Sequence, residues 1–553
     1  MRHLYQASLA LGLLTLGTLP LGNLSRANDD PAPDLLPRDR PIAAVIDHYL
    51  NLQIAEQGVT PAPLADDATL LRRLTLDLNG RIPTAAEYTE YTASTDPKKK
   101  EKLVDRLMAS PAFVRHQVEE LDAMLVVPGA SGRRGTTGSV REYLTRAVRE
   151  NRGWDKIYRD LMLADDKAEK GSTGFLKARI KDQDRLTTDV SVLFFGVNIS
   201  CAQCHDHPLV EDWKQEHYYG LKSFLARTYE AGNVLAERDS GIVSYKTPKN
   251  ENKTARMMFL TGKVVDAPGM VATSKEKGKK NNTQADKGNK NAPPPAPKFS
   301  ARAALVELSL QPDQRHFFAK SIVNRMWYRF FGLGLVSPID QMHSANDPSH
   351  PELLEWLARD TAEQGYDLRR LIRGIVLSDA YARSSVYEGD KVPFAKLFAV
   401  ARLRPLTPMQ LVTSMRVGLS APDYLGLSAK PEEREKRLEM LENSSRGLAS
   451  LLEQPRDDFQ ISVLEALLFS NSERVQKELL ADSTDRLIGQ LKNEKNLDQA
   501  ADQLFAHLLI RKPTPQEKAA VVDYLASRKD RPVEALRQVA WAMLTSAEFR
   551  FNY

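Results

Sequence analysis

The chain has 553 residues, of which 27% are charged and 42% hydrophobic, with a formal net charge of +5 at pH 7. This composition is that of an ordinary globular protein, and the length allows about three or four domains. Because so small a net charge indicates no basic surface, we expect no nucleic-acid partner.

The first 27 residues predict an export signal. Arg2 begins a short basic region, an apolar run extends from Ala7 to Leu19, and Ser25-Arg26-Ala27 has the small residues of a cleavage site. The run is shorter than the ~20 apolar residues that cross a bilayer. We therefore expect cleavage after Ala27, a periplasmic or secreted protein, and no transmembrane segment in the cleaved form.

Residues 28–40 are rich in Asp and Pro and predict a flexible leader, whereas residues 41–228 predict a helical domain. Apolar residues recur at helical spacing from Leu70 to Leu78, where Asn79-Gly80 is typical of a helix end. The segment from Thr84 to Glu87 has the pattern of a capping box and predicts the start of the next helix.

The most informative motif of this domain is Cys201-Ala202-Gln203-Cys204-His205, which contains both cysteines of the chain. Two thiols at this spacing, followed directly by a histidine, are typical of c-type haem attachment: the thiols add to the haem vinyl groups and the histidine ligates the iron. Cys201, Cys204 and His205 are therefore the candidate haem-binding residues of an exported electron-transfer accessory. The opposite axial position is open to His217, Met342, His343 and His350.

Two other interpretations of the motif stay open. Together with one or two of His205, His207 and His217, the thiols could hold zinc or copper in an exported metal-dependent enzyme. A disulfide between them could instead lock a loop of a non-catalytic envelope-binding protein. The sequence contains no P-loop, nucleophile elbow or H-E-x-x-H helix, so it assigns no reaction.

Residues 229–268 predict a small β insertion, with strands at 241–245 and 257–265. Residues 269–299 are dominated by Lys, Asn and Pro, can bury little apolar surface, and predict a disordered linker. Residues 300–550 return to helical spacing and predict a second helical domain. The expected fold class is therefore mainly α, with two multi-helical modules, the β insertion and the linker.

Within the second helical domain, aromatic residues such as Trp327 and Trp356 are assigned to the core. Two polar segments are less easily explained as core. They are Asn324-Arg325 on a predicted helix and the Pro-bounded loop from Asn346 to Pro351, and loops of this kind often carry functional residues.

Short motifs recur along the chain. The segment from Arg81 to Glu87 matches that from Arg511 to Glu517, and Gly153-Trp154-Asp155 matches Gly365-Tyr366-Asp367. In the second pair each Asp is expected to cap the helix that follows. Similar helix ends are also found at Ser110, Ser378 and Ser546. Shared helix-cap chemistry and an internal duplication explain these matches equally well, and either origin assigns the residues to the scaffold.

Two sets of motifs resemble known families. Ile46-Asp47, Leu76-Asp77-Leu78-Asn79-Gly80, the segment 201–208 and Tyr218-Tyr219-Gly220 are similar to the planctomycete cytochrome-like domain of unknown function 1549. Asn324-Arg325-Met326-Trp327 and the segments 331–336, 348–354 and 546–549 are similar to its usual companion, domain of unknown function 1553. The resemblance implies an exported protein whose partners are other exported redox or sulfatase-like proteins, and it implies no established reaction.

Overall fold

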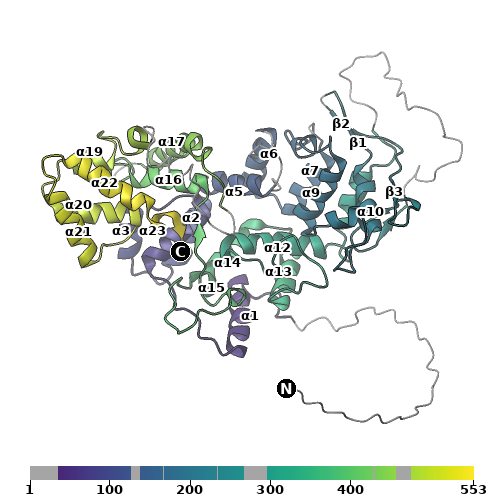
Figure 1. Ribbon diagram of the computed structural model, residues 1–553, viewed down its shortest axis with the longest axis horizontal. Coiled ribbons are helices and arrows are strands. Elements are labelled where there is room, and N and C mark those ends of the chain that lie inside the picture. The colour runs from purple at the N-terminus through teal and green to yellow at the C-terminus, as the bar shows by residue number, and fades with distance from the viewer. Residues whose placement is uncertain are drawn as a thin grey trace, which may run out of the picture. The chain divides into compact units, whose positions relative to one another are not determined.

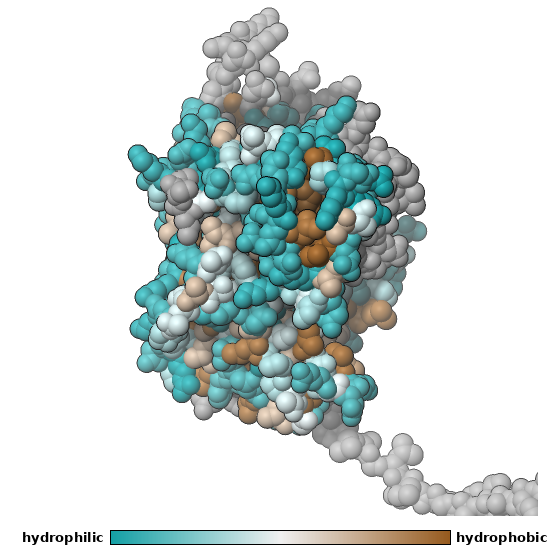
Figure 2. All heavy atoms as spheres, turned by 90° about the vertical axis from the view of Figure 1, so that its left-hand side faces the viewer, coloured by the Kyte–Doolittle hydropathy of each residue, from teal (hydrophilic) through white to brown (hydrophobic). Residues whose placement is uncertain are grey.

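The computed structural model describes residues 35–125, 138–165, 167–232, 234–266, 296–426, 430–455 and 475–553. The predicted export signal, residues 28–34 of the predicted leader and residues 269–295 of the predicted linker lie outside these ranges. In the described ranges the chain is mainly helical, as the sequence predicts (Figure 1). Hydrophilic residues predominate on the face seen in Figure 2, where hydrophobic ones form separate patches. Among the residues described, none of the helices combines the length and the apolar character that a bilayer crossing requires.

The first half of the chain is a succession of helices that leads to the cysteine motif. They are α1 (Ile42–Glu56), α2 (Asp67–Asn79), α3 (Ala85–Ala93), α4 (Lys99–Ala109), α5 (Pro111–Met124), α6 (Gly138–Arg149), α7 (Trp154–Leu163), α8 (Gly174–Lys177), α9 (Gln183–Phe195), the 3-10 turn η1 (Ser200–Gln203) and α10 (Gln215–Leu225).

Three antiparallel two-stranded sheets follow, which confirms a small β region. They pair β1 (Thr228–Ala231) with β2 (Val234–Glu237), β3 (Ser244–Lys246) with β4 (Asn252–Thr254), and β5 (Met257–Met258) with β6 (Val264–Val265). The single strand expected at 257–265 is wrong, because Gly262 has a φ of 81° and turns the chain back on itself between β5 and β6.

The second half is again helical. Its elements are α11 (Ala301–Ser309), α12 (His316–Phe331), α13 (Pro351–Glu363), α14 (Leu368–Leu377), α15 (Asp379–Ala382), η2 (Ala395–Leu397), β7 (Arg404–Pro405), α16 (Pro408–Gly418), α17 (Pro431–Ala449), η3 (Val475–Leu479), α19 (Leu487–Leu491), α20 (Leu497–Leu504), η4 (Phe505–Leu509), α21 (Pro515–Ala526), α22 (Pro532–Thr545), α23 (Ala547–Arg550) and β8 (Phe551–Asn552), which pairs with β7.

The matching segments at 81–87 and 511–517 have the same local structure. Thr84 and Thr514 each begin a capping box, and Arg81 and Arg511 each donate two hydrogen bonds to the glutamate of the box, at 2.8 and 2.9 Å in the first segment and 2.8 and 2.7 Å in the second. The preceding helices also match: α2 has 13 residues, and α20 and η4 have 8 and 5. Each helix ends at a left-handed residue, Gly80 or Ile510.

The two Gly-x-Asp turns contact each other. The Trp154 amide donates to the Tyr366 carbonyl at 3.0 Å, and a Cβ added to Gly153 would lie 2.2 Å from the Gly365 carbonyl oxygen. Asp367 caps α14 as predicted, accepting from the Arg370 amide at 3.1 Å. The same prediction for Asp155 is wrong: the capping position before α7 is occupied by Gly153, which provides no side-chain cap.

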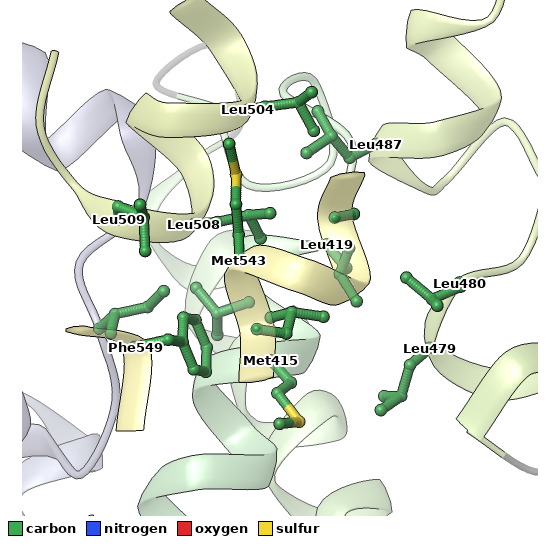
Figure 3. Close-up of a cluster of buried hydrophobic side chains, with 14 of the residues drawn as sticks. Met415, Leu419, Leu479, Leu480, Leu487, Leu504, Leu508, Leu509, Met543 and Phe549 are labelled. Carbon is green, nitrogen blue, oxygen red and sulfur yellow. The ribbon is translucent and has the colours of Figure 1, made fainter. Parts of the chain in front are cut away.

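Two buried cores are relevant to the sites described below. A cluster of buried hydrophobic residues joins α16, α20, η4, α22 and α23, and Figure 3 shows members such as Met415, Leu504 and Phe549 converging. Leu76 and Ile82 from the start of the chain belong to the same cluster. In the other core Phe194 contacts Tyr158, Tyr158 contacts Phe318 and Phe318 contacts Tyr366, and these rings join α7, α9 and α12.

The core assignment of Trp327 and Trp356 is confirmed, since both side chains are fully buried. Buried apolar residues from both halves of the chain therefore pack together, and residues 36–553 form one compact unit.

Candidate functional site

Both thiols of the cysteine motif lie on one tight turn. Cys201 belongs to η1 and Cys204 directly follows it, with the Cys204 amide 3.4 Å from the Cys201 carbonyl. Both cysteines are free and exposed, whereas Ala202 between them is fully buried. The turn is therefore anchored through Ala202 and presents the two sulfur atoms to solvent.

Helix α10 holds this turn from one side (Figure 1). The buried Gln215 side chain donates from Nε2 to the Cys204 carbonyl at 3.0 Å, and the Tyr219 hydroxyl donates to the Gln203 carbonyl at 3.0 Å. The Asp206 carboxylate accepts from the Gln215 amide at 2.9 Å, at the first residue of α10. Because a helix start favours negative charge, Asp206 ties the motif to the positive end of the helix.

The β3–β4 hairpin contacts two of these α10 residues, Tyr219 and Gln215. Tyr245 of β3 stacks on Tyr219 with ring centroids 4.2 Å apart and planes 6° from parallel. The Gln215 Nε2 atom also lies 3.3 Å from the Lys246 carbonyl. The β region thus supports the cysteine turn through α10.

Residues 340–344, from the second half of the chain, form hydrogen bonds with the residues that precede and follow the cysteine turn. The Asn198 amide donates to the Asp340 carbonyl at 2.8 Å, and the Met342 amide donates to the Gly196 carbonyl at 3.1 Å. Beyond the turn, the Asp212 carboxylate accepts from the amide and the hydroxyl of Ser344 at 2.8 and 2.6 Å. Residues 340–344 therefore contact the chain on both sides of the motif.

The polar pair Asn324-Arg325 has a structural role in this bracing. Asn324 exchanges two hydrogen bonds with the backbone of Val336, at 2.9 and 3.0 Å, and Arg325 donates to the Val192 carbonyl of α9. Both side chains are buried. They fix the start of the loop that runs to residue 344.

His205 is the histidine whose hydrogen bonding leaves a nitrogen free for a metal. Its Nδ1 lies 2.7 Å from the Asp206 carbonyl oxygen. Since a carbonyl can only accept, Nδ1 carries the proton, and the neutral ring keeps a lone pair on Nε2. This arrangement is typical of histidines that ligate metals, which donate their other ring N–H to a carbonyl or carboxylate.

His207 and His217 have the opposite arrangement. Their Nδ1 atoms accept from the amides of Leu209 and Lys214, each at 3.2 Å, so the proton of each neutral ring lies on Nε2. Burial also lowers the pKa of His217, which stacks edge-on against Trp213. Within the described ranges no three His, Cys, Asp or Glu side chains converge as a metal site would require. His205 therefore differs from the other two predicted metal ligands in the ring nitrogen that keeps its lone pair.

The four candidates for a second iron ligand are hydrogen-bonded or buried. His343 accepts from the Ala345 amide at Nδ1, at 3.2 Å, in the same way as His217. Met342 is buried, with its sulfur 3.0 Å from where a Cβ of Gly196 would lie. His350 is 3% exposed, its Nδ1 is 3.1 Å from the Ser349 hydroxyl, and its ring lies against Phe398. Of the four candidates, His217 and His343 thus accept backbone hydrogen bonds at Nδ1, and Met342 and His350 are buried.

The supporting residues Gln215, Tyr245 and Ser344 were not predicted from the sequence. Tyr219 lies in a motif that carries the family resemblance, which is the one sequence signal that singles it out. The contacts of residues 340–344 join positions more than a hundred residues apart, and no local pattern encodes such a pairing.

Comparison with known proteins identifies two family regions. Residues 45–230 match the family described as PSCyt2, protein of unknown function (DUF1549). Residues 301–457 match the family described as PSD1, protein of unknown function (DUF1553). No curated protein and no solved structure matches the chain. The first region contains the cysteine turn, α10 and the start of β1, and the second contains the bracing segment.

Proposed function

We propose that this chain, which belongs to the DUF1549 and DUF1553 families, is an exported cytochrome-like protein that attaches c-type haem and acts as an electron-transfer accessory. Cys201 and Cys204 would form the two thioether bonds, and the His205 Nε2 atom would ligate the iron. The bound haem would supply one-electron transfer, with other exported redox proteins as partners.

One observation carries this proposal: the His205 Nδ1–H donates to the Asp206 carbonyl at 2.7 Å beside two exposed thiols on a single turn. Attachment requires both sulfur atoms to be reachable by the haem vinyl groups, and the exposed turn allows this. Ligation requires a lone pair on the histidine nitrogen, which the hydrogen bond at Nδ1 leaves on Nε2.

The protein's own residues would keep this geometry when the group is bound. Asp206 holds the His205 ring through its carbonyl and the start of α10 through its carboxylate. Gln215 and Tyr219 fix the carbonyls of the turn, so the thiols keep their places. Of the other candidate iron ligands, His217 and His343 accept backbone hydrogen bonds and Met342 and His350 are buried, so His205 is the residue that would hold the iron.

The test is expression of the full chain in bacteria with and without the cytochrome c maturation system. We expect periplasmic protein that begins at Asn28, gains the mass of one haem in the presence of the system, and shows the α band of a reduced c-type haem. Cys204→Ser should lose this species. His205→Gln should keep the thioether-linked mass but change the spectrum, because only the iron ligand is removed.

His207→Gln and His217→Gln are matched controls. Both substitutions should leave haem content unchanged, because these rings already accept backbone hydrogen bonds. A colourless protein with stoichiometric zinc or copper that either substitution abolishes would replace the haem proposal with the metal site. A colourless, metal-free protein with oxidised cysteines would replace it with the structural disulfide.

A further inference from the structure

The matching helices α2 and α20–η4 place two different buried residues at the same position. Asp77 and His507 each lie three residues before the left-handed residue that ends the helix, Gly80 or Ile510. Asp77 is 4% exposed and His507 is 8% exposed. The two side chains have different surroundings.

The space around the Asp77 carboxylate is filled by other side chains. Arg404 donates to both oxygens at 2.9 and 2.6 Å, the Tyr381 hydroxyl donates at 2.7 Å, and Asn552 donates from Nδ2 at 2.9 Å. Arg329 further donates to the Asp77 carbonyl at 3.0 Å. The first position is therefore complete within the chain.

A pocket of about 230 Å³ that opens to solvent lies beside His507. Neither ring nitrogen of His507 has a hydrogen-bond partner among the residues that the structure describes. The π-helical turn η4, which carries His507, is of a kind found often at functional sites. The other lining residues are Thr84, Ala85, Ala86, Thr89, Val417, Ser420, Ala421, Pro422 and Leu425.

The lining restricts the chemistry of an occupant. It contains no charged side chain, and each of its hydroxyls already makes a hydrogen bond: Thr84 accepts from the Glu87 amide, Thr89 donates to the Ala85 carbonyl, and Ser420 donates to the Arg416 carbonyl. Burial lowers the pKa of His507 to about 4, so the imidazole is neutral at pH 7. A charged ligand would lose its hydration without a counter-charge.

We propose that this cavity binds a small neutral molecule with an apolar body and a single hydroxyl or N–H group, which hydrogen-bonds to His507. The volume supports a one-ring compound, because an apolar cavity of about 150 Å³ holds benzene. Val417, Pro422 and Leu425 would contact the ring, and the imidazole would accept the one polar hydrogen. Phenol is the simplest member of this class.

The test is titration of the full chain with phenol, followed by calorimetry. Phenol should bind to the wild type, whereas benzoate, which has the same ring and a negative charge, should bind at least about tenfold more weakly. His507→Phe should weaken phenol binding about tenfold through loss of the hydrogen bond. His48→Gln, which changes an exposed histidine, should leave phenol binding unchanged.

A second variant separates loss of binding from loss of folding. Ala86→Leu places a larger side chain at the half-buried cavity wall on α3, so it should block phenol while keeping the thermal unfolding temperature of the wild type. The proposal is overturned if phenol does not bind to folded wild type, if benzoate binds equally well, or if His507→Phe or Ala86→Leu binds phenol like the wild type.

Discussion

Asp77 is the most heavily hydrogen-bonded carboxylate of the molecule's described interior and stabilises charges that would otherwise be buried alone. Arg404 and Arg329 both lie against it, and Arg329 is also paired with Glu120 at 3.4 Å. Burial raises the pKa of Glu120 and lowers that of Arg329. Arg404 and Arg329 therefore both depend on Asp77 as a hydrogen-bond acceptor, Arg404 on its carboxylate and Arg329 on its carbonyl.

Asp77→Asn is expected to lower the free energy of unfolding by about 3–5 kcal/mol, because it removes the counter-charge of a buried arginine. Urea denaturation of the purified protein measures the change. Asp105→Asn removes an exposed partner of Arg373 and should cost less than about 0.5 kcal/mol. Equal effects of the two substitutions would contradict a stabilising role of the buried carboxylate.

At the residue scale the sequence predicts chemistry only where the partner is local. The place of His205 directly after the two cysteines is enough to predict it as a ligand. Its difference from His207 and His217 could not be predicted, since it depends on whether a carbonyl or an amide faces Nδ1. Asp155 shows the opposite error, because this residue of capping type lies in the first turn of α7, whereas Gly153 occupies the capping position.

At the scale of elements, the chain uses one helix-start motif twice in different surroundings. The side chains of Arg81 and Glu87 are 6% and 16% exposed, whereas those of Arg511 and Glu517 are 29% and 36% exposed. At Glu87 burial is the largest single effect and raises the pKa, but the interactions with Arg81 outweigh it and lower the pKa to about 2. At Glu517 the hydrogen bonds from Arg511 are the largest effect and lower the pKa to about 2. The same ion pair is therefore less screened by water in the first copy.

Glu87→Gln is expected to cost about 2–3 kcal/mol of stability and Glu517→Gln about 0.5–1 kcal/mol. The second loss is smaller also because Arg511 keeps Glu548, at 2.5 Å, as a partner. Thermal or urea unfolding of the two variants gives the comparison. A larger loss for Glu517→Gln would show that exposure does not decide the strength of the motif.

Capping patterns were good predictors of these elements. Thr84 with Glu87, and Asn79-Gly80, predicted a helix start and a helix end that the structure confirms, because caps involve residues within one turn of each other. The β5–β6 hairpin was missed, since the apolar residues from Met257 to Val265 form a continuous run around Gly262 and conceal the turn.

At the scale of the whole molecule, buried histidines make stability depend on pH. His116, His350 and His507 are 7%, 3% and 8% exposed. Burial lowers the pKa of His116 to about 3, helped by Arg329, and lowers the pKa of the other two to about 4. In the unfolded chain these rings take up protons near pH 6.5, whereas in the folded protein they stay neutral until far lower pH.

The free energy of unfolding should therefore fall as the pH drops from about 6.5 towards 4, by up to about 1.4 kcal/mol per pH unit for each of the three histidines. Urea unfolding at pH 7 and pH 5 measures the loss. His350→Gln should reduce the difference between the two pH values, and the exposed-site variant His48→Gln should not. Equal stability of the wild type at both pH values would disprove the explanation.

The spacing of apolar residues predicts the mainly helical architecture, but it does not predict which residues of the two halves contact each other. Nothing around Gly196 or Asn198 indicates that residues 340–344 will pair with them, and nothing around Leu76 indicates that it joins the core of α16 and α22. Such contacts depend on the three-dimensional path of the chain, which short patterns do not encode.

The hydrogen bond between Asn552 and Asp77 links residues 475 positions apart. Helix α2 therefore cannot complete its buried hydrogen bonds until residue 552 has been synthesised, so this early helix forms before one of its partners exists.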